Sequence, residues 1–205
     1  MNIPTIQQAI NILEEAGSLN PVPWVQHSYF TAQAARNIAA HCPELDEDAA
    51  YVFGLLHDIG RRFGVTAIRH VLDGYQYLLD MGYPDAAQIS LTHSFPMHTL
   101  KTYSGSWDGS EAELQFTAET LQSMHYTAYD RLIQLCDCLA LPDGFCLMEK
   151  RFIDVCLRYK INEGYQEIWL AYLSLKDEFS SLIGMSIYQV LPGIVENTFG
   201  FVPSS

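Results

Sequence analysis

Residues 54–60, Gly-Leu-Leu-His-Asp-Ile-Gly, carry two adjacent side chains that could bind a metal ion. Residues 48–56 are almost wholly apolar without the alternation of a strand, which predicts a buried helix ending near His57 and Asp58. A buried imidazole beside a carboxylate needs partners, because burying an uncompensated charge is strongly unfavourable. A divalent metal ion would satisfy both side chains; the alternative is a structural Asp-His pair that caps the helix end. Gly60 is expected to end this helix at a positive φ angle.

Asp137 also stands out by its surroundings. It lies in a largely apolar stretch, residues 127–141, for which a helix is predicted. Because Asp is almost never fully buried unless it is paired or metal-bound, Asp137 is a candidate metal ligand. Histidines stand at the ends of three further predicted helices: His27, His70 and His93. A lone histidine in the first turn of a helix, such as His27, is more often a surface or capping residue than a ligand.

Two consecutive arginines, Arg61 and Arg62, follow the His-Asp pair. They could bind an anionic substrate through forked hydrogen bonds, or they could offset the acidic surface. Arg151 and Arg158 lie two helical turns apart and could also reach a ligand. Acidic neighbours such as Asp154 favour surface ion pairs for them instead.

Apolar residues at helical spacing, bounded by glycine and proline turns, predict helices along the whole chain. The expected helices cover residues 3–16, 24–40, 46–58, 69–81, 84–93, 111–125, 127–141, 145–160, 163–182 and 184–192. Residues 94–110 are rich in turn residues, which predicts a long loop whose His98 and Trp107 could cover a pocket. The predicted fold class is all-α, with residues 1–205 forming a single compact multi-helix domain.

The composition narrows the range of partners. The formal net charge of −13, from 11 basic and 24 acidic residues, disfavours nucleic-acid polymers and anionic membranes and favours a small ligand. The five cysteines form an odd set without Cys-x-x-Cys, so reduced, cytoplasmic thiols are expected rather than disulfides or a thiolate zinc site. The first 17 residues lack the features of a signal peptide, and no stretch approaches the roughly 20 apolar residues of a membrane-spanning helix.

The order of the candidate ligands resembles that of the HD superfamily of metal-dependent phosphohydrolases. The pattern of that family is a histidine, a His-Asp pair and a distant aspartate, which correspond here to His27, His57, Asp58 and Asp137. Ile59 and Gly60 extend the pair as in the HDIG variety. The resemblance covers about residues 24–141, which implies an HD-type core there and leaves residues 142–205 as a helical extension without an assigned role.

Family members with two metals insert further histidines between the pair and the last aspartate. His70 and His93 occupy those places in this chain. The resemblance therefore implies one metal bound by the four-residue pattern and a second bound by Asp58, His70 and His93. Imidazole and carboxylate ligands without thiolate suit Fe, Mn, Zn, Co or Ni. Two such ions, roughly 3.5 to 4 Å apart, would stabilise the attacking and leaving oxygens of an in-line displacement.

The chain also departs from some family members. Ser94 follows His93 where some two-metal relatives carry consecutive histidines, so a sixth histidine is absent, or is replaced by water or by His98. The Gly-Tyr-Pro segment of the cyclic-dinucleotide members is missing from its expected loop, because residues 82–84 lie before His93. This removes a cyclic dinucleotide as the expected substrate.

The resemblance implies a metal-dependent phosphohydrolase with one or two divalent transition-metal ions. His57 and Asp58 are expected at the reaction centre, and Arg61 or Arg62 at the phosphate of a small substrate, which a nucleotide would fit. Two alternatives remain: an HD-type diiron oxygenase with the same ligands, and a metal-containing ligand-binding or sensor domain without turnover. An occluded pocket would mark the sensor. The sequence leaves the metal, the substrate and the oligomeric state open.

Overall fold

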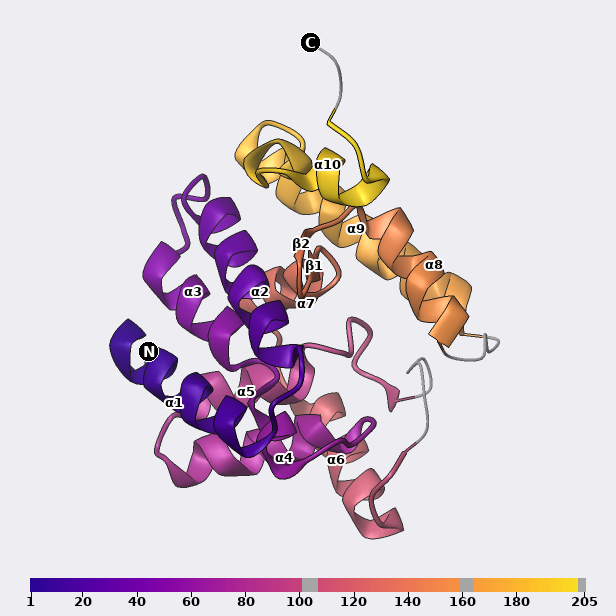
Figure 1. Ribbon diagram of the computed structural model, residues 1–205. Helices are drawn as coiled ribbons and strands as arrows, with labels where there is room; N and C mark the ends of the chain where they lie inside the picture. Colours follow the sequence, from indigo (N-terminus) through magenta and orange to yellow (C-terminus); the bar gives the residue numbers. More distant parts are fainter. Residues whose placement is uncertain (101–106, 159–163, 203–205) are drawn as a thin grey trace.

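The computed structural model describes residues 1–100, 107–158 and 164–202, and within them the chain is helical (Figure 1). The fold class predicted from the sequence is confirmed, since the sheet in these ranges is one small hairpin. The elements are α1 (Ile6–Leu19), α2 (Trp24–Ala39), α3 (Glu47–Leu56), η1 (Ile59–Phe63), α4 (Arg69–Asp80), α5 (Pro84–Thr92), α6 (Glu111–Ser123), α7 (Ala128–Asp137), β1 (Ala140–Leu141), β2 (Gly144–Phe145), α8 (Met148–Arg158), α9 (Tyr165–Ile183), η3 (Ile187–Val190) and α10 (Ile194–Phe199). No described helix is both long and apolar enough to cross a membrane.

Helices α2 and α3 approach each other closely because small residues line their contact. A Cβ atom added to Gly54 of α3 would lie 2.3 Å from the Cα atom of Ala32 in α2. Only glycine allows the two backbones to come this near. The close packing brings His27 of α2 and His57, which follows α3, to 5.3 Å between ring centroids.

Gly60 allows two segments to pack closely, and it does not adopt a positive φ angle. The prediction that it ends the helix with positive φ is wrong, because Gly60 is absent from the positive-φ glycines and lies inside the 3-10 helix η1. Helix α3 ends at Leu56, four residues earlier. A Cβ atom at Gly60 would lie 1.9 Å from the carbonyl oxygen of His70 and 2.5 Å from the amide nitrogen of Gly74. Glycine is therefore required for η1 to pack against α4.

Helices α4 and α5 pack against each other in the same manner. A Cβ atom at Gly74 of α4 would lie 2.2 Å from Oγ of Ser90 in α5. Beside this contact, a second apolar cluster forms from Ile68, Val71, Leu91, Phe95 and Leu121. The pairing sets His70, near the start of α4, 5.5 Å from His93, at the end of α5, between ring centroids.

Helix α7 ends at Asp137, four residues before the predicted end at residue 141. The next residues form the hairpin in which Ala140 of β1 pairs with Phe145 of β2, around the predicted Pro-Asp-Gly turn. Asp137 is thus the last residue of its helix rather than a mid-helix residue. All five cysteines, which include Cys138 beside it, are free.

The C-terminal helices form a layer on one side of the molecule. Figure 1 shows α8, α9 and α10 together beyond the hairpin, and α4, α5 and α6 at the opposite end of the view. The helix predicted over residues 184–192 is wrong in its extent, because regular structure there is limited to η3 (Ile187–Val190). Met185 lies between the left-handed C-cap of α9, Gly184, and η3.

Candidate metal centre

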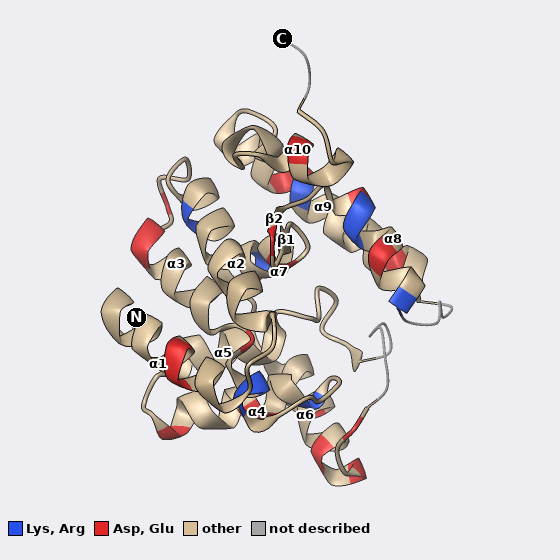
Figure 2. Ribbon diagram, in the orientation of Figure 1, with Lys and Arg blue, Asp and Glu red and all other residues tan. Residues whose placement is uncertain are grey.

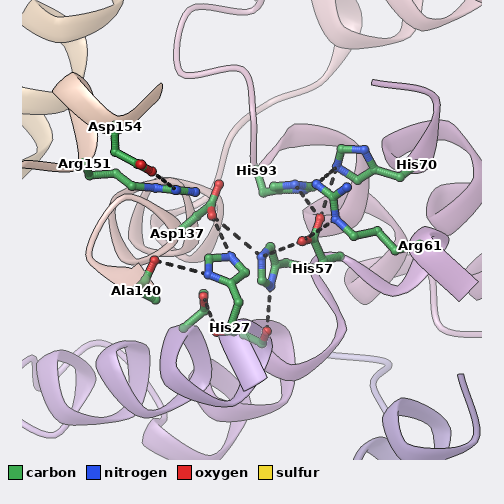
Figure 3. A network of polar contacts seen from close by, with 12 residues as sticks. His27, His57, Arg61, His70, His93, Asp137, Ala140, Arg151 and Asp154 are labelled. Carbon is green, nitrogen blue, oxygen red and sulfur yellow. Dashed lines mark hydrogen bonds and ion pairs between the residues drawn. The ribbon is translucent and has the colours of Figure 1, made fainter. Parts of the chain in front are cut away.

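Six ligand-type side chains from five segments converge between the helix ends (Figure 3). They fall into three overlapping groups whose ligand atoms lie within 4.8 Å of one another. The groups are His27, His57 and Asp58; His57, His93 and Asp137; and Asp58, His70 and His93. All six residues assigned as ligands from the sequence belong to at least one of these groups. These groups fit a metal site.

Backbone carbonyls fix the orientation of all four imidazole rings. Each Nδ1 faces a carbonyl oxygen: His27 that of Ala140 at 3.2 Å, His57 that of Gly54 at 2.7 Å, His70 that of Ala67 at 2.5 Å and His93 that of Ser90 at 2.9 Å. A carbonyl oxygen only accepts hydrogen bonds, so Nδ1 carries the hydrogen in each ring. A neutral ring then has its lone pair on Nε2, which points into the cluster. This is the usual arrangement of metal-binding histidines.

Two buried polar atoms at the centre of the cluster have no hydrogen bond within the described chain. His57 Nε2 lies 3.8 Å from Asp58 Oδ2 and 3.9 Å from Asp137 Oδ1, too far for hydrogen bonds. Asp58 Oδ1 lies 3.1 Å from His70 Nε2 and 3.5 Å from His93 Nε2, but neither nitrogen has a hydrogen to donate in the tautomer described above. A cation placed between these lone pairs would satisfy all of them. The residues present therefore fit a metal ion.

His27 and Asp137 form the most direct contact in the cluster. His27 Nε2 lies 2.9 Å from Asp137 Oδ1, and the Asp137 side chain is 20% exposed. Asp137 is the partly open ligand of the set, since the side chain of Asp58 is only 5% exposed. The cluster is consequently reached from the side of Asp137.

Burial keeps two of the imidazoles neutral. It lowers the pKa of His57 to about 4, although Asp58 and Asp137 favour the protonated ring. Burial and the nearby Arg61 guanidinium lower the pKa of His70. Neutral imidazole is the form that binds metal, so both rings are ready to act as ligands near neutral pH.

The two carboxylates stay ionised despite burial. Burial alone would raise the pKa of Asp58, but Arg61 and His57 hold it well below its usual range. Burial likewise opposes ionisation of Asp137, and the contact with His27 holds the pKa of Asp137 below its usual value. The cluster thus combines two negative charges with the neutral rings of His57 and His70, which suits a divalent cation.

The two arginines after the His-Asp pair point in different directions. Arg61 Nε donates to Asp58 Oδ2 at 2.7 Å, and this guanidinium lines the cavity described below. Arg62 instead pairs with Glu15 of α1 at 3.1 Å, and its guanidinium lies 4.0 Å from the ring centroid of Tyr77. Arg62 does not line the cavity. The structure therefore brings Arg61 to the site but not Arg62, whose expected contact with substrate is not supported.

A cavity of about 350 Å³ opens on the cluster. On one side it is lined by five of the ligand-type residues, His27, Asp58, His70, His93 and Asp137, together with Arg61. On the other side it is lined by α8 and α9, with Arg151, Phe152, Arg158, Tyr165, Trp169 and Tyr172 among the residues. The sequence favoured surface ion pairs for Arg151 and Arg158. Both do pair with Asp154, at 3.3 and 2.8 Å, but they also face the cavity.

Among the described residues of the loop predicted over residues 94–110, Ser94 lines this cavity. Residues 101–106 lie outside the described residues. His98 stacks on Tyr126 with 3.5 Å between ring centroids and belongs to none of the ligand groups, so it does not supply a sixth histidine. Trp107 donates to the carbonyl of Ser110 at 2.9 Å and does not line the cavity. The expected cover over a pocket by these two residues is not found.

Comparison with known proteins identifies the segment that carries the cluster. The family model described as HD domain matches residues 24–141. All six ligand-type residues lie within this match, and α8, α9 and α10 lie outside it. No curated protein and no solved structure matches the chain.

Proposed function

The chain belongs to the HD domain family, and from this premise we propose that it is a metal-dependent phosphohydrolase acting on a small phosphorylated substrate. The observation that carries the proposal is the convergence of four imidazoles and two carboxylates beside a cavity with arginines on its walls. Membership of this family supports the proposal, since HD domains are mostly metal-dependent hydrolases.

We assign the six side chains to one or two divalent transition-metal ions. His27, His57, Asp58 and Asp137 would hold the first ion, and Asp58, His70 and His93 would hold the second. His57, Asp58 and His93 each belong to two of the three groups, and Asp58 suits a shared ligand because it is the carboxylate among them. A bound divalent ion supplies Lewis-acid polarisation of a phosphoryl oxygen and lowers the pKa of a coordinated water. Iron, manganese, zinc, cobalt and nickel all accept this ligand set.

The protein's own groups orient the site. The backbone carbonyls that accept from Nδ1 hold the imidazole rings with Nε2 facing inward. Arg61 occupies Oδ2 of Asp58 and leaves Oδ1 directed into the cluster. The same guanidinium lines the cavity, and its Nη2 lies 3.4 Å from His70 Nε2. Because a guanidinium has five N–H donors, it can also meet phosphate oxygens there.

The distribution of positive charge supports an anionic substrate. The chain has only 11 Lys and Arg residues against 24 acidic residues, yet three arginines line the cavity: Arg61, Arg151 and Arg158. Figure 2 shows acidic residues spread over the outer helices and blue segments along α8, which carries Lys150, Arg151 and Arg158. Cations concentrated at one cavity of an acidic protein favour binding of a phosphate there.

The size of the cavity supports a small substrate rather than a polymer. About 350 Å³ lies in the range of small-molecule sites, which runs from about 300 to 1,000 Å³. The net charge of −13 also disfavours a nucleic-acid backbone or an anionic membrane as partner. A phosphate monoester such as a mononucleotide is of the proposed class.

Two observations favour hydrolysis over the alternatives. The diiron oxygenase would use the same ligands, but the arginines beside them suit the charged oxygens of a phosphate ester. The sensor without turnover was expected to have an occluded pocket, whereas the cavity reaches Asp58, His70 and Asp137. Phosphoryl transfer needs such positive groups near its charged oxygens.

The proposal is tested on protein purified without oxygen, so that any iron stays reduced. Elemental analysis is followed by a panel of phosphate monoesters and nucleotides, with phosphate release and oxygen consumption measured together. We expect phosphate release that a chelator abolishes and that a divalent metal restores. Oxygen consumption without hydrolysis of any ester would instead assign the chain to the oxygenases.

A further inference from the structure

Helices α8 and α9 form the wall of the cavity that faces the metal-ligand cluster. They lie outside the residues matched by the family, 24–141, so the family pattern gives this wall no role. The wall contains cationic, aromatic and hydroxyl side chains on one face of each helix. Groups of these three kinds can recognise a ligand, and each kind is supplied by particular residues of α8 or α9.

The cationic part of the wall is Arg151 on α8. Its side chain is 18% exposed and contacts one oxygen of Asp154 through Nη1 at 3.3 Å. Figure 3 shows Arg151 and Asp137 on the same side of the histidine cluster, with the guanidinium extending toward Asp137. Arg158 joins the same carboxylate of Asp154 at 2.8 Å. The two guanidinium groups thus share one carboxylate, and both line this end of the cavity.

The aromatic part comes from residues one helical turn apart. Phe152 of α8 stacks on Trp169 of α9, with ring centroids 5.4 Å apart and planes inclined by 7°. Tyr165, one turn before Trp169, meets it edge to face at 6.1 Å. All three line the cavity, so flat apolar ring surface is presented beside the cationic groups. Such a surface stacks favourably on another planar ring.

The hydroxyl of Tyr165 is the wall's unsatisfied polar group. Tyr165 is 3% exposed, and its Oη has no hydrogen-bond partner among the described residues. A buried hydroxyl without a partner is costly, and such a group in a cavity wall is a candidate for bonding a ligand. It lies on the same helix as Trp169, so its partner would be a polar atom on a ring stacked there.

We propose that α8 and α9 form the recognition wall for a phosphate monoester whose leaving group carries a planar aromatic ring. Arg151 binds the phosphate from the side opposite Arg61, Trp169 and Phe152 contact the ring, and the Tyr165 hydroxyl donates to a polar substituent of the ring. This inference rests on the proposed function, because the phosphate is the group held at the metal-ligand cluster. It assigns the C-terminal extension to choosing the leaving group.

Binding of phosphonates tests the wall without depending on turnover, because their P–C bond is not hydrolysed as an ester. Calorimetry on the full-length, metal-loaded protein compares phenylphosphonate with methylphosphonate. We expect phenylphosphonate to bind about tenfold more tightly, as one stacked ring contributes. This comparison uses the parent protein and needs no variant to fold. Equal dissociation constants for the two phosphonates would overturn the inference.

Three variants then locate the contacts. Trp169→Leu should remove the preference for the phenyl group, and Arg151→Met should weaken both phosphonates equally. Tyr165→Phe should weaken 4-nitrophenylphosphonate about threefold and leave phenylphosphonate unchanged. Lys150→Met is the matched control, because Lys150 precedes Arg151 on α8 but binds the carbonyl of Asn197 at 3.0 Å outside the cavity. A preference that survives Trp169→Leu would contradict the proposed ring contact.

The outcome for the wall is separate from the outcome for hydrolysis. If the parent protein prefers phenylphosphonate but hydrolyses no ester, the proposed phosphohydrolase activity fails and the recognition wall stands. If esters are hydrolysed but the phosphonates bind alike, the activity stands and the wall serves only to pack the extension.

Discussion

Arg61 Nε donates to Oδ2 of Asp58 at 2.7 Å, while the second oxygen of that carboxylate has no hydrogen bond within the described chain. One oxygen is therefore fixed by a cation of the protein, and the other is directed to the imidazoles of the cluster. Arg61 holds Asp58 ionised and in a single orientation. It also faces the cavity, so it links the ligand cluster to the substrate.

Substitution of Arg61 should impair the use of phosphate esters. A hydrogen bond to a charged group contributes about 1.5–3 kcal/mol, so Arg61→Met should lower kcat/KM about 10- to 100-fold. Arg62→Met is the matched control because Arg62 pairs with Glu15 away from the cavity. Metal content is measured for both variants, so that loss of metal is not mistaken for loss of substrate contact. Equal kcat/KM in the two variants would contradict this role of Arg61.

The metal-free protein should lose stability as the pH falls from about 6.5 to about 4. Burial lowers the pKa of His57 from its ordinary 6.5 to about 4, so within this window the unfolded chain binds more protons than the folded one. The contribution of His57 is fully present above 6.5 and amounts to about 3 kcal/mol. The pKa of His70 is lowered too and acts in the same direction. Asp58, whose pKa is depressed, adds a loss only below its ordinary 3.8.

Urea unfolding of chelator-treated protein at several pH values measures this effect. We expect the unfolding free energy to fall steadily between pH 6.5 and 4.5, and less steeply for His57→Asn than for the parent. An unfolding free energy that is constant across this range would show that the imidazole is not held neutral by burial.

Gly60→Ala should disturb the junction between η1 and α4. The added Cβ atom would meet two backbone atoms, His70 O at 1.9 Å and Gly74 N at 2.5 Å, neither of which can rotate away. Overpacking of this kind costs about 1–3 kcal/mol or more, and here it also displaces His70 from Asp58. Gly82→Ala, where φ is +79° and no atom lies within 4 Å of the added Cβ atom, is the control for a destabilising Gly→Ala change away from the cluster. Weaker metal binding in the Gly60 variant only is the expected result.

The number of bound metal ions should depend on His70 and His93, the two histidines between the His-Asp pair and Asp137. His70→Ala and His93→Ala should lower the stoichiometry at saturating metal from about two ions per chain towards one. Outer groups can change affinity about 10- to 100-fold, so stoichiometry rather than affinity decides the point. Variants that bind as many ions as the parent, and as tightly, would leave a single-metal site.

Much of the ligand cluster was predictable because its residues are polar while the neighbouring sequence is apolar. His57 and Asp58 follow an apolar helix, and Asp137 ends another, so each needs a partner that the local sequence does not provide. Helix boundaries were also predictable where capping residues mark them, as at Asp46, whose side chain accepts from the amide of Ala49 at 2.7 Å.

The remaining features depend on which faces of distant helices meet, and no local pattern reports this. Gly60 looked like a helix terminator, but its role is set by the approach of His70, ten residues later. Arg61 and Arg62 are chemically equal in the sequence, and only the position of Glu15 on α1 separates them. The sequence shows an acidic neighbour of Arg151 at i+3, Asp154. The position of Arg151 in the cavity wall instead results from the packing of the C-terminal layer.

The central claim is that the His-Asp cluster binds a divalent metal, and metal content tests it most directly. Mass-spectrometric elemental analysis of anaerobically purified protein compares the parent with Asp58→Asn, which keeps the side-chain volume and removes the charge. Because Asp58 belongs to two of the three ligand groups, we expect one or two transition-metal ions per parent chain and a nearly empty variant. Native metal content in Asp58→Asn, or a parent that binds no transition metal under these conditions, would contradict the account.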